Sequence, residues 1–444
     1  MGRARGRRCR GHGREPHVKA QVRIERYADQ GRCVAHIDGR VVFVRFALPG
    51  ELVTVELDEP HARDDRFWTG EVCEVLEASD DRVPPAWPLA GPLASGGGVG
   101  GADLVHVSLP GQLRWKAATV REQMRRLGRA DVDVSVERMP GDEEAGGLHW
   151  RTRIEMVADE EGFASMRRRG SHVRVRLDDM PLASRALLDV ARRAHVWDGG
   201  FEPGARIRLA VPEPRDGGDG ITGDDPGTDA NFAVMVDGGL TEGSRRLTER
   251  IRVDGRDFRY GVEASGFWQI HREAPMRLPV HVLSLMREAL DGAESAVLWD
   301  LYSGSGLFSL PLAALAAPRT RMLTVEGAPD AVASARRNLR DAGLDAVDAR
   351  CGDVARTLTQ VPADLARPDV VVLDPPRAGA RAGVCRRIAE SGCRAVIYVA
   401  CDPTSLARDT ATLGELGYEP RDVRAFDIYP MTHHVETVAL FRRV

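Results

Sequence analysis

One cysteine stands out because of the residues around it. In the stretch IYVACDPTSLARD, Cys401 follows a short β-branched and aromatic run and precedes Asp402 and Pro403. The run predicts a buried strand, and an Asp-Pro pair suits the N-cap and the first residue of a helix. A helix N-terminus favours a thiolate, although the charge of Asp402 opposes this effect. Cys401 is therefore a candidate nucleophile, whereas a cysteine without such neighbours is more often a buried structural thiol.

A glycine turn marks a candidate cofactor site. The stretch DLYSGSG at residues 300–306 follows a predicted strand and opens a predicted helix, and its glycines let the backbone approach a ligand closely. Glu326 ends the next predicted strand, where a carboxylate can accept hydrogen bonds from ribose hydroxyls. Ser309 stands where a dinucleotide fingerprint has its third glycine. The pattern therefore favours S-adenosylmethionine over a nicotinamide dinucleotide.

Two further predicted strand ends carry acids. Asp353 follows DAVDARCG, where it can reach an adenine amino group, and Asp374 begins the motif DPPR after VVVL. Taken alone, Asp374 is more often a turn residue. The rigid Pro-Pro pair and the position in the same nucleotide-binding domain favour an active-site edge. Arg377 follows the prolines, where an aromatic residue would indicate methylation of an exocyclic amine.

Cys401 and an acid near the C-terminus, Glu436 in HHVETVAL, suit methylation of uracil at C5. Uracil C5 is a poor nucleophile, but thiolate addition at C6 turns the ring into an enolate whose C5 can attack a sulfonium methyl group. A base must then remove the C5 proton so that the thiolate can leave. This chemistry needs one cysteine and one carboxylate, and the sequence offers a candidate for each.

The elements that must position these residues form an α/β pattern. From residue 258 onward predicted strands and helices alternate, which indicates a doubly wound, Rossmann-like domain. Residues 18–78 contain short β-like runs separated by glycine turns, which is typical of an OB-like barrel that binds oligonucleotides. Between them a Pro/Gly-rich stretch at 84–101 marks a boundary, and residues 113–128 predict an amphipathic helix.

Residues 150–247 read as β-rich, with a helix at 181–194 and a solvated hairpin tip at 216–229. We therefore expect a multi-domain protein with four parts. They are a disordered basic tail (1–17), a β-barrel (18–78), a central α+β domain (79–255) and an S-adenosylmethionine-dependent catalytic domain (256–444). The helix at 113–128 belongs to the central domain and is expected to pack on the catalytic domain.

Composition limits the class of protein. The chain has 444 residues, a formal net charge of −4 and only two lysines, so that almost every cation is arginine. Its seven cysteines include no CxxC pair, which argues against zinc ribbons and disulfide frameworks. No apolar run is long enough to cross a bilayer, and no apolar segment follows the basic N-terminal residues. We expect a cytoplasmic monomer that does not bind a membrane.

Several motifs together resemble the RNA uracil-5 methyltransferase family, in particular its members with an N-terminal TRAM domain. They are LRWKAATVREQMRRLG, GFWQIHREA, DLYSGSGLFSLPLA, VEGAPDAVASARRN, VVLDPPRAGA, IYVACDPTSLARD and THHVETVALF. The resemblance implies that Cys401 is the nucleophile, that Glu436 removes the proton and that S-adenosylmethionine is the methyl donor. It also implies that the donor pocket, or the grip on the uracil, is formed by Gln269, Tyr302, Gly304, Leu307, Glu326, Asp353 and Asp374.

One departure from the family pattern concerns iron. Many TRAM-bearing members hold an iron–sulfur cluster through four cysteines, but the corresponding stretches here, LASGGGVGGADLVHVS and RLDDMPLAS, contain none. Because a cluster needs thiolate ligands, we expect no iron–sulfur cluster and no metal. The resemblance favours 23S rRNA as the substrate, with the T-loop uridine of tRNA as the alternative. A non-catalytic RNA-binding protein that keeps a methyltransferase scaffold is the alternative from another class, and a nicotinamide dehydrogenase is a distant third.

Some residues have simpler explanations. His433 and His434 are expected to pack near the site rather than to bind metal. Phe43, Phe67 and Trp68 are expected in the barrel core, although they are also able to stack on bases. Residues 167–169 (RRR) fit a solvated hairpin tip and a contact to RNA phosphate equally well.

Overall fold

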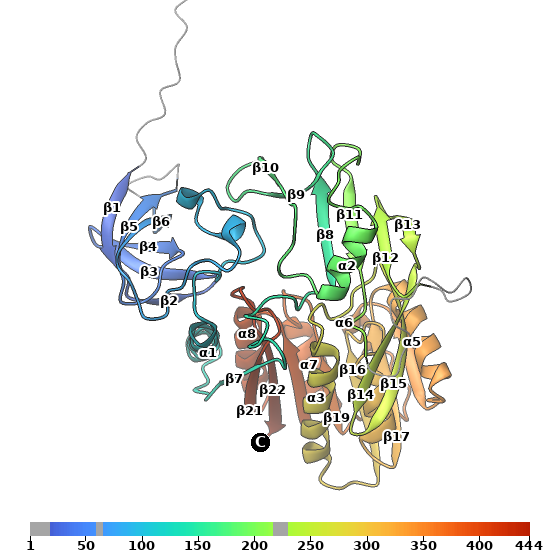
Figure 1. The fold of residues 1–444 in the computed structure, drawn as a ribbon. Helices are drawn as coiled ribbons and strands as arrows, with labels where there is room; N and C mark the ends of the chain where they lie inside the picture. Colours follow the sequence, from blue (N-terminus) through green and yellow to red (C-terminus); the bar gives the residue numbers. More distant parts are fainter. Residues whose placement is uncertain (1–17, 59–64, 216–229) are drawn as a thin grey trace, which may run out of the picture.

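The computed structural model describes residues 18–58, 65–215 and 230–444. Two expectations, the basic tail at 1–17 and the hairpin tip at 216–229, fall outside the described residues. Figure 1 shows a β-barrel beside a second β-rich part, with the α/β part below both of them. No helix in the described ranges is long and apolar enough to cross a membrane.

The barrel is built from six short strands. Their order in the sheet is β1-β5-β6-β4-β3-β2. Val53, Val55 and Leu57 of β5 are buried while the residues between them are partly exposed, which is the alternation expected of a strand with one face on a core. The strands are β1 (Lys19–Arg23), β2 (Arg26–Ala28), β3 (Arg32–Ile37), β4 (Arg40–Arg45), β5 (Leu52–Leu57) and β6 (Trp68–Glu77).

The barrel aromatics correct one expectation. Val42 and Val44 of β4 point into the core, so Phe43 between them lies on the outer face. Phe67 is 50% exposed and contacts Phe43 edge-to-face at 5.3 Å between ring centroids. The prediction that Phe67 lies in the barrel core is therefore wrong, and Trp68 is only half-buried.

The Pro/Gly-rich stretch after the barrel is packed, with two short 3-10 helices, η1 (Pro88–Ala90) and η2 (Leu93–Ser95). Trp87, Val99 and Leu104 are buried in one apolar cluster with barrel residues and with residues of the central sheet. The stretch whose composition predicts a domain boundary thus joins the barrel and the central sheet through a common core.

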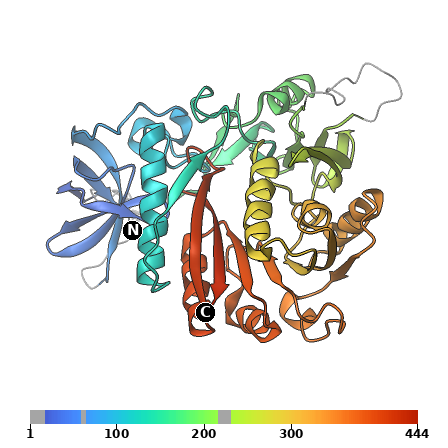
Figure 2. The ribbon, with the colours of Figure 1, turned by 90° about the horizontal axis from the view of Figure 1, so that it is seen from below.

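Helix α1 (Leu109–Arg126) begins four residues before the predicted start. Ser108 caps it by accepting a hydrogen bond from the Gly111 amide at 3.1 Å, and Pro110 fits the first turn. Val120 and Met124 belong to the apolar cluster of the α/β part. Figure 2 shows α1 between the barrel and the strands near the C-terminus.

The central sheet has the order β10-β9-β8-β11-β12-β13. Its strands are β8 (Arg153–Ala158), β9 (Ala164–Arg167), β10 (Arg174–Arg176), β11 (Arg206–Ala210), β12 (Ala233–Val236) and β13 (Gly239–Gly243). Helix α2 (Arg185–Arg193) begins later than predicted because Ser184 is its N-cap and accepts a hydrogen bond from the Leu187 amide at 3.2 Å.

The α/β part contains an eight-stranded sheet with the order β18-β17-β16-β19-β20-β22-β21-β7. Strand β22 is antiparallel to its neighbours, and β7 (Ser135–Arg138) joins the edge from far upstream in the chain. The other strands are β16 (Ser295–Leu301), β17 (Arg319–Glu326), β18 (Val347–Cys351), β19 (Val370–Leu373), β20 (Ala395–Ala400), β21 (Tyr418–Asp427) and β22 (Glu436–Arg443).

Helices cover both faces of this sheet. Val370 and Val372 of β19 belong to one apolar cluster, and Val371 and Leu373 to the other, so alternate residues of one strand face opposite helical layers. The helices are α3 (Ala274–Leu290), α4 (Ser309–Leu315), α5 (Pro329–Asp341), α6 (Val354–Thr357), α7 (Arg381–Ser391) and α8 (Pro403–Glu415). This is the predicted Rossmann-like architecture.

A hairpin of β14 (Arg246–Val253) and β15 (Arg256–Glu263) packs beside the α/β part. Leu247, Ile251 and Phe258 share the apolar cluster of α3. The expected domain boundary at 255/256 falls between these two paired strands.

Candidate active site

Strand register brings the candidate catalytic residues together at one edge of the sheet. The pairing of β20 with β22 ends at Ala400 and Thr437, so Cys401 and Glu436 are the next residues on adjacent strands. Leu373 of β19 pairs with Tyr398 of β20, which places Asp374 beside them. The carboxyl ends of parallel strands form the usual ligand-binding edge of such sheets.

Cys401 lies between β20 and α8, as its sequence context predicts. Asp402 caps α8 by accepting a hydrogen bond from the Ser405 amide at 2.7 Å. The thiol is half-buried, and burial together with the nearby carboxyls of Glu436 and Asp374 raises the pKa of Cys401 to about 12. The Arg377 guanidinium opposes this increase in pKa. In the free protein Cys401 is therefore a neutral thiol at pH 7.

Glu436 is 2% exposed, and its Oε1 has no hydrogen-bond partner within the described residues. Burial and the neighbouring Asp374 raise its pKa well above the usual range, whereas a hydrogen bond from Tyr429 favours the charged form. A buried, incompletely hydrogen-bonded carboxyl is costly. Such a group beside a thiol is a candidate for proton transfer.

Asp374 connects this pair to a second group of acids. Burial, Asp300 and Glu326 raise the pKa of Asp374 to about 7. Burial also raises the pKa of Asp300 to about 7; Ser309 donates a hydrogen bond to its Oδ2 at 2.5 Å, while its Oδ1 has no partner among the described residues. Asp374 raises the pKa of Cys401 and of Glu436, and its own pKa is raised by Asp300 and Glu326. It therefore lies between the two groups of acids at this edge.

The glycine turn holds the other candidates. Leu301 pairs with Val325, so Tyr302 and Glu326 follow on adjacent strands. Tyr302 has a positive φ of 62° and Gly304 one of 54°, and such a turn favours glycine. The Glu326 carboxylate accepts hydrogen bonds from the Gly304 amide at 3.0 Å and the Ala328 amide at 2.7 Å. Leu307 is buried, and its carbonyl accepts a hydrogen bond from Tyr260 at 3.1 Å.

Asp353 and Gln269 complete the predicted set. Asp353 caps α6 by accepting a hydrogen bond from the Arg356 amide at 2.9 Å, and its charge helps to raise the pKa of Tyr302 to about 12, after burial. Gln269 is 4% exposed, and its Oε1 has no partner in the described part of the chain. Its neighbour Phe267 is 72% exposed.

These residues fit S-adenosylmethionine. The ligand carries an ammonium group, ribose hydroxyls and an adenine amine, all hydrogen-bond donors. The edge offers acceptors, among them the unpartnered oxygens of Asp300 and Gln269 and the remaining lone pairs of Glu326. In the described ranges, no group of three or more His, Cys, Asp or Glu side chains is able to hold a metal ion. The absence of an iron–sulfur cluster stays a prediction.

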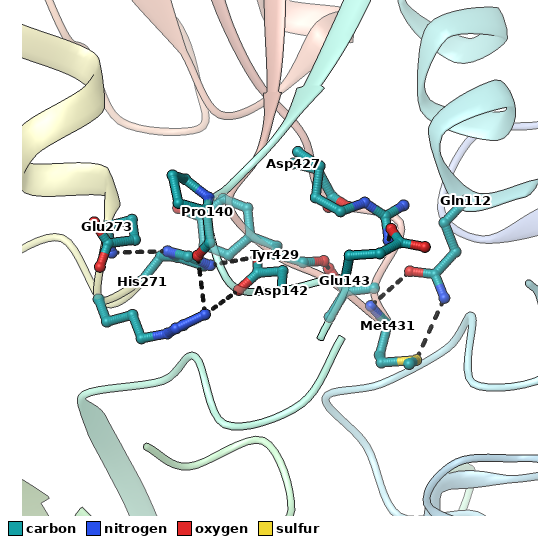
Figure 3. Close-up of polar contacts among 12 residues, drawn as sticks. Gln112, Pro140, Asp142, Glu143, His271, Glu273, Asp427, Tyr429 and Met431 are labelled. Atoms are coloured by element: carbon teal, nitrogen blue, oxygen red, sulfur yellow. Dashed lines mark hydrogen bonds and ion pairs between the residues drawn. The ribbon is translucent and has the colours of Figure 1, made fainter. Parts of the chain in front are cut away.

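Sequence reasoning missed the residues that hold the loop before Glu436. Lys116 of α1 is fully buried and bonds to Asp427 and to the Tyr429 carbonyl. Gln112 accepts a hydrogen bond from the Met431 amide at 2.8 Å and donates one to the Met431 sulfur at 3.3 Å (Figure 3). More than 300 positions separate these partners in the sequence, so no local pattern links them.

The central part also holds this loop. His271 donates a hydrogen bond from Nε2 to Asp142 at 2.9 Å and accepts one at Nδ1 from the Glu273 amide at 3.0 Å (Figure 3). Trp150 stacks on His271 and meets the Tyr429 ring edge-on, with centroids 6.2 Å apart. This contact positions the residue that bonds to Glu436.

The two histidines of THHVE pack near the site, as expected. His433 bonds to Asp103 at 2.6 Å, and the rings of His433 and His434 lie 4.1 Å apart. Burial, His433 and Arg377 lower the pKa of His434 to about 3. The neutral His434 accepts a hydrogen bond at Nε2 from Arg377 at 3.1 Å. This bond fixes a nearby cation that favours a Cys401 thiolate.

Comparisons with known proteins identify the family of the chain. Residues 240–444 match the family described as tRNA (Uracil-5-)-methyltransferase, and residues 19–64 match the TRAM domain. An uncharacterized RNA methyltransferase of Bifidobacterium longum is 70% identical over 96% of this chain and 97% of its own length.

A 23S rRNA (uracil(1939)-C(5))-methyltransferase of Chromohalobacter salexigens is 33% identical over 95% of this chain and 88% of its own length. The crystal structure of a Pyrococcus abyssi tRNA (uracil-54, C5)-methyltransferase with S-adenosyl-L-homocysteine has the same fold, with a TM-score of 0.62 and 20% identity over 95% of this chain and 99% of that one. The chain belongs to the RNA uracil-5 methyltransferase family.

Proposed function

We propose that this protein methylates C5 of a uridine in 23S rRNA through a covalent bond between Cys401 and C6 of the base. The adjacent positions of Cys401 and Glu436 at the carboxyl edge of the sheet are the observation that carries the proposal. S-adenosylmethionine, when bound beside them, supplies an electrophilic methyl group. Asp374 orients the uracil. The methyl donor is held by Gln269, Asp300, Tyr302, Gly304, Leu307, Glu326 and Asp353.

Cys401 acts first. Its thiolate adds to C6, and the π electrons of the C5–C6 bond shift toward the C4 carbonyl oxygen to give an enolate. C5 of this enolate becomes the nucleophile. The Arg377 guanidinium favours the thiolate. The carboxyls of Glu436 and Asp374 oppose it while they are charged, so addition proceeds best when both are neutral, the state that their raised pKa values favour.

Glu436 acts last. Once sulfur is bonded to C6 it carries no charge, and the electrostatic obstacle to an ionised Glu436 is smaller. The carboxylate then removes the C5 proton, the C5–C6 double bond re-forms and Cys401 leaves as a thiolate. Tyr429 supports this step because its hydrogen bond favours the charged form of Glu436.

The relatives support rRNA as the substrate. Two relatives named as 23S rRNA (uracil(1939)-C(5))-methyltransferases, from Chromohalobacter salexigens and Shewanella amazonensis, align along 95% and 96% of this chain at 33% and 29% identity. The tRNA enzyme from Pyrococcus abyssi, at 20% identity, supports the fold alone.

Mapping of 5-methyluridine tests the target. We expect ribosomal RNA from cells that lack the gene to lose 5-methyluridine, and the purified protein to restore it in 23S rRNA with labelled S-adenosylmethionine. Transfer RNA from the same cells should be unchanged. Loss of 5-methyluridine from the T-loop of tRNA, with rRNA unchanged, would contradict the rRNA assignment and keep the chemistry.

A further inference from the structure

The hairpin formed by β9 (Ala164–Arg167) and β10 (Arg174–Arg176) is the most basic element of the central sheet. Residues 163–177, FASMRRRGSHVRVRL, contain five arginines and no acid. Arg167 and Arg174 are direct partners in the antiparallel register. Like charges placed opposite each other on neighbouring strands destabilise the pairing, so this arrangement is costly in the absence of an anion.

The arginines of the hairpin have different environments. Arg169 pairs with Glu71 of the barrel at 3.3 Å, donates to the Gly91 carbonyl at 3.0 Å and lies over the Phe46 ring at 4.6 Å. It fastens the hairpin to the barrel. Arg168 also faces the segment after the barrel, through the Gly96 carbonyl at 3.4 Å. These two arginines are engaged by the protein itself.

Arg176 is engaged as well, since it lies over the Phe163 ring at 3.5 Å and pairs with Asp178 at 3.0 Å. Arg167 and Arg174 differ from it. Within the described residues, neither side chain forms an ion pair or a hydrogen bond. Arg167 is exposed and Arg174 half-buried, and Val173 at the tip is 55% exposed.

The hairpin lies beside the barrel and above the α/β part (Figure 1). Figure 1 shows it between the barrel and the rest of the central sheet, and shows β22 running away from it to the C-terminus. Because β20 is antiparallel to β22 and parallel to β19, the carboxyl ends of β19 and β20 point toward the side of the hairpin. The barrel itself is acidic, since residues 18–78 contain eight basic and twelve acidic residues. Attraction of RNA by charge therefore has a better source in the hairpin than in the barrel.

We propose that Arg167 and Arg174 bind a backbone phosphate of the RNA substrate, and that the β9–β10 hairpin is a phosphate-binding element. Two guanidinium groups on directly paired strands are close enough to share one phosphate, and each presents a planar fork of donors that matches phosphate oxygens. A bound phosphate also removes the repulsion between the two arginines. The inference rests on the proposed function only in that the substrate is RNA.

The chain offers a matched control in Arg250 and Arg259, which are also direct cross-strand partners, in the β14–β15 hairpin. That hairpin lies against α3 and α5. Its residues 246–263 include four acids, and Arg259 donates to Thr248 at 3.4 Å. Removing these two charges changes the net charge of the protein by the same amount in another place.

The test measures binding of a 23S rRNA transcript to the full-length protein at several salt concentrations. Each phosphate contact contributes about 0.7 to 0.9 to the slope of log K against log salt. We expect the Arg167→Gln/Arg174→Gln variant to lose about one contact from this slope and to bind about tenfold more weakly at low salt. The Arg167→Lys/Arg174→Lys variant should keep the slope and recover part of the affinity.

The Arg250→Gln/Arg259→Gln control should bind like the wild type. No variant should melt below the wild type, since removal of like charges from a cross-strand pair does not weaken the pairing, and all variants should keep the S-adenosylmethionine affinity. An unchanged slope in the Arg167→Gln/Arg174→Gln variant, or an equal loss in the control, would overturn the inference. The outcome is separable from the proposed function, because salt-dependent binding of the same transcript does not require methylation. If the slope changes but the protein forms no 5-methyluridine in rRNA, the assignment of rRNA as the substrate is wrong and the hairpin contact stands.

Discussion

The two halves of the catalytic edge differ in how their acidic groups are held. We call the part with Gln269, Asp300, Glu326 and Asp353 the donor half, and the part with Cys401, Asp374 and Glu436 the acceptor half. On the donor half, Glu326 accepts two backbone amides and Asp353 accepts one as a helix cap. On the acceptor half, Glu436 Oε1 and Thr437 Oγ1 have no partner among the described residues. The carboxylates in the turn and the helix cap of the donor half are thus held by local amides before ligand binding, and within the described ranges Asp300 Oδ1 and Gln269 Oε1 stay open there. On the acceptor half the candidate proton-transfer group Glu436 is itself incompletely bonded.

This difference has a physical cause. Turns and helix caps are local, so a short stretch of sequence can saturate its own carboxylates with its own amides. Cys401, Glu436 and Asp374 come from three strand ends and place three ionisable groups in a partly buried space. Glu436 and Asp374 raise the pKa of Cys401, and Asp374 raises that of Glu436. The acceptor half therefore tolerates few negative charges at a time. Such strain in a native structure is expected where chemistry occurs.

The largest effect that sharpens this comparison is expected from Asp374→Asn. Asp374 interacts with acids of both halves, and the variant replaces the carboxyl that orients the uracil with an amide. We expect single-turnover methylation to fall by about a thousandfold, within the range seen for a positioned acid or base. The affinity for S-adenosylmethionine, measured by calorimetry, should change by less than about threefold, which is no more than the loss of one weak hydrogen bond would cause. A large loss of donor affinity with normal single-turnover rates would place Asp374 in the donor half alone.

The second effect concerns the donor half. Glu326→Gln removes a charged acceptor that a ribose would use, and charged hydrogen bonds contribute about 1.5–3 kcal/mol. S-adenosylmethionine should therefore bind about tenfold to a hundredfold more weakly. At saturating donor the methylation rate should stay close to that of the wild type. A reduced rate with unchanged donor affinity would show that Glu326 serves the acceptor half.

The third effect is the pH dependence of the thiol. Because the pKa of Cys401 is raised to about 12, its alkylation by iodoacetamide should accelerate about tenfold per pH unit from pH 7 to 10, without a plateau. Glu436→Gln removes one cause of the raised pKa and should speed alkylation at pH 8. The exposed Cys351 is an internal reference in the same mass spectra. An alkylation rate that stops increasing below pH 8 would show that the pKa of Cys401 is not raised, and would contradict the crowding of acidic groups in the acceptor half.

The smallest effect is on stability. Asp300 and Asp374 have an ordinary pKa of 3.8 when unfolded and of about 7 in the fold. The folded state therefore retains protons that the unfolded state loses, and this stabilisation is present below pH 3.8 and is lost as pH rises through 7. The melting temperature of the ligand-free protein should decrease from pH 5.5 to 8. In Asp374→Asn the decrease should be smaller, and an equal decrease would show that Asp374 does not contribute.

The local parts of the site could be predicted from the sequence. The strand before Cys401, the cap at Asp402 and the glycine turn at 300–306 all appear where short-range signals place them. The adjacency of Cys401 and Glu436 follows from the resemblance to a family, since the antiparallel insertion of β22 beside β20 is a long-range pairing. No local pattern reports such a pairing.

What the sequence could not show depends on distant contacts. Strand β7 joins the catalytic sheet by pairing with β21, almost 300 residues downstream. The buried Lys116 sits on a helix whose pattern looks amphipathic, and its partner Asp427 ends β21. The three arginines at 167–169 could not be told apart by sequence. Only contacts with distant residues, such as those of Arg169 with Glu71 and of Arg168 with the Gly96 carbonyl, distinguish a structural arginine from a free one.

The shared core also changes how the barrel must be tested. Trp87, Val107 and Trp115 pack in one cluster with barrel residues. Deleting residues up to 78 would expose them to water, with a loss of stability that is unrelated to RNA. Point variants on the barrel surface and on the β9–β10 hairpin separate RNA binding from folding.

The most direct test of the central claim compares Cys401→Ala with Glu436→Gln on the RNA substrate in the presence of S-adenosylmethionine. Glu436→Gln keeps addition and methyl transfer but lacks the base for elimination. A methylated RNA–protein complex should then accumulate and survive denaturing electrophoresis, as should a complex of the wild type with RNA that contains 5-fluorouridine. Cys401→Ala should form no such complex and no 5-methyluridine, while binding S-adenosylmethionine normally. A denaturation-stable complex formed by Cys401→Ala would contradict the account and assign the nucleophile to another cysteine.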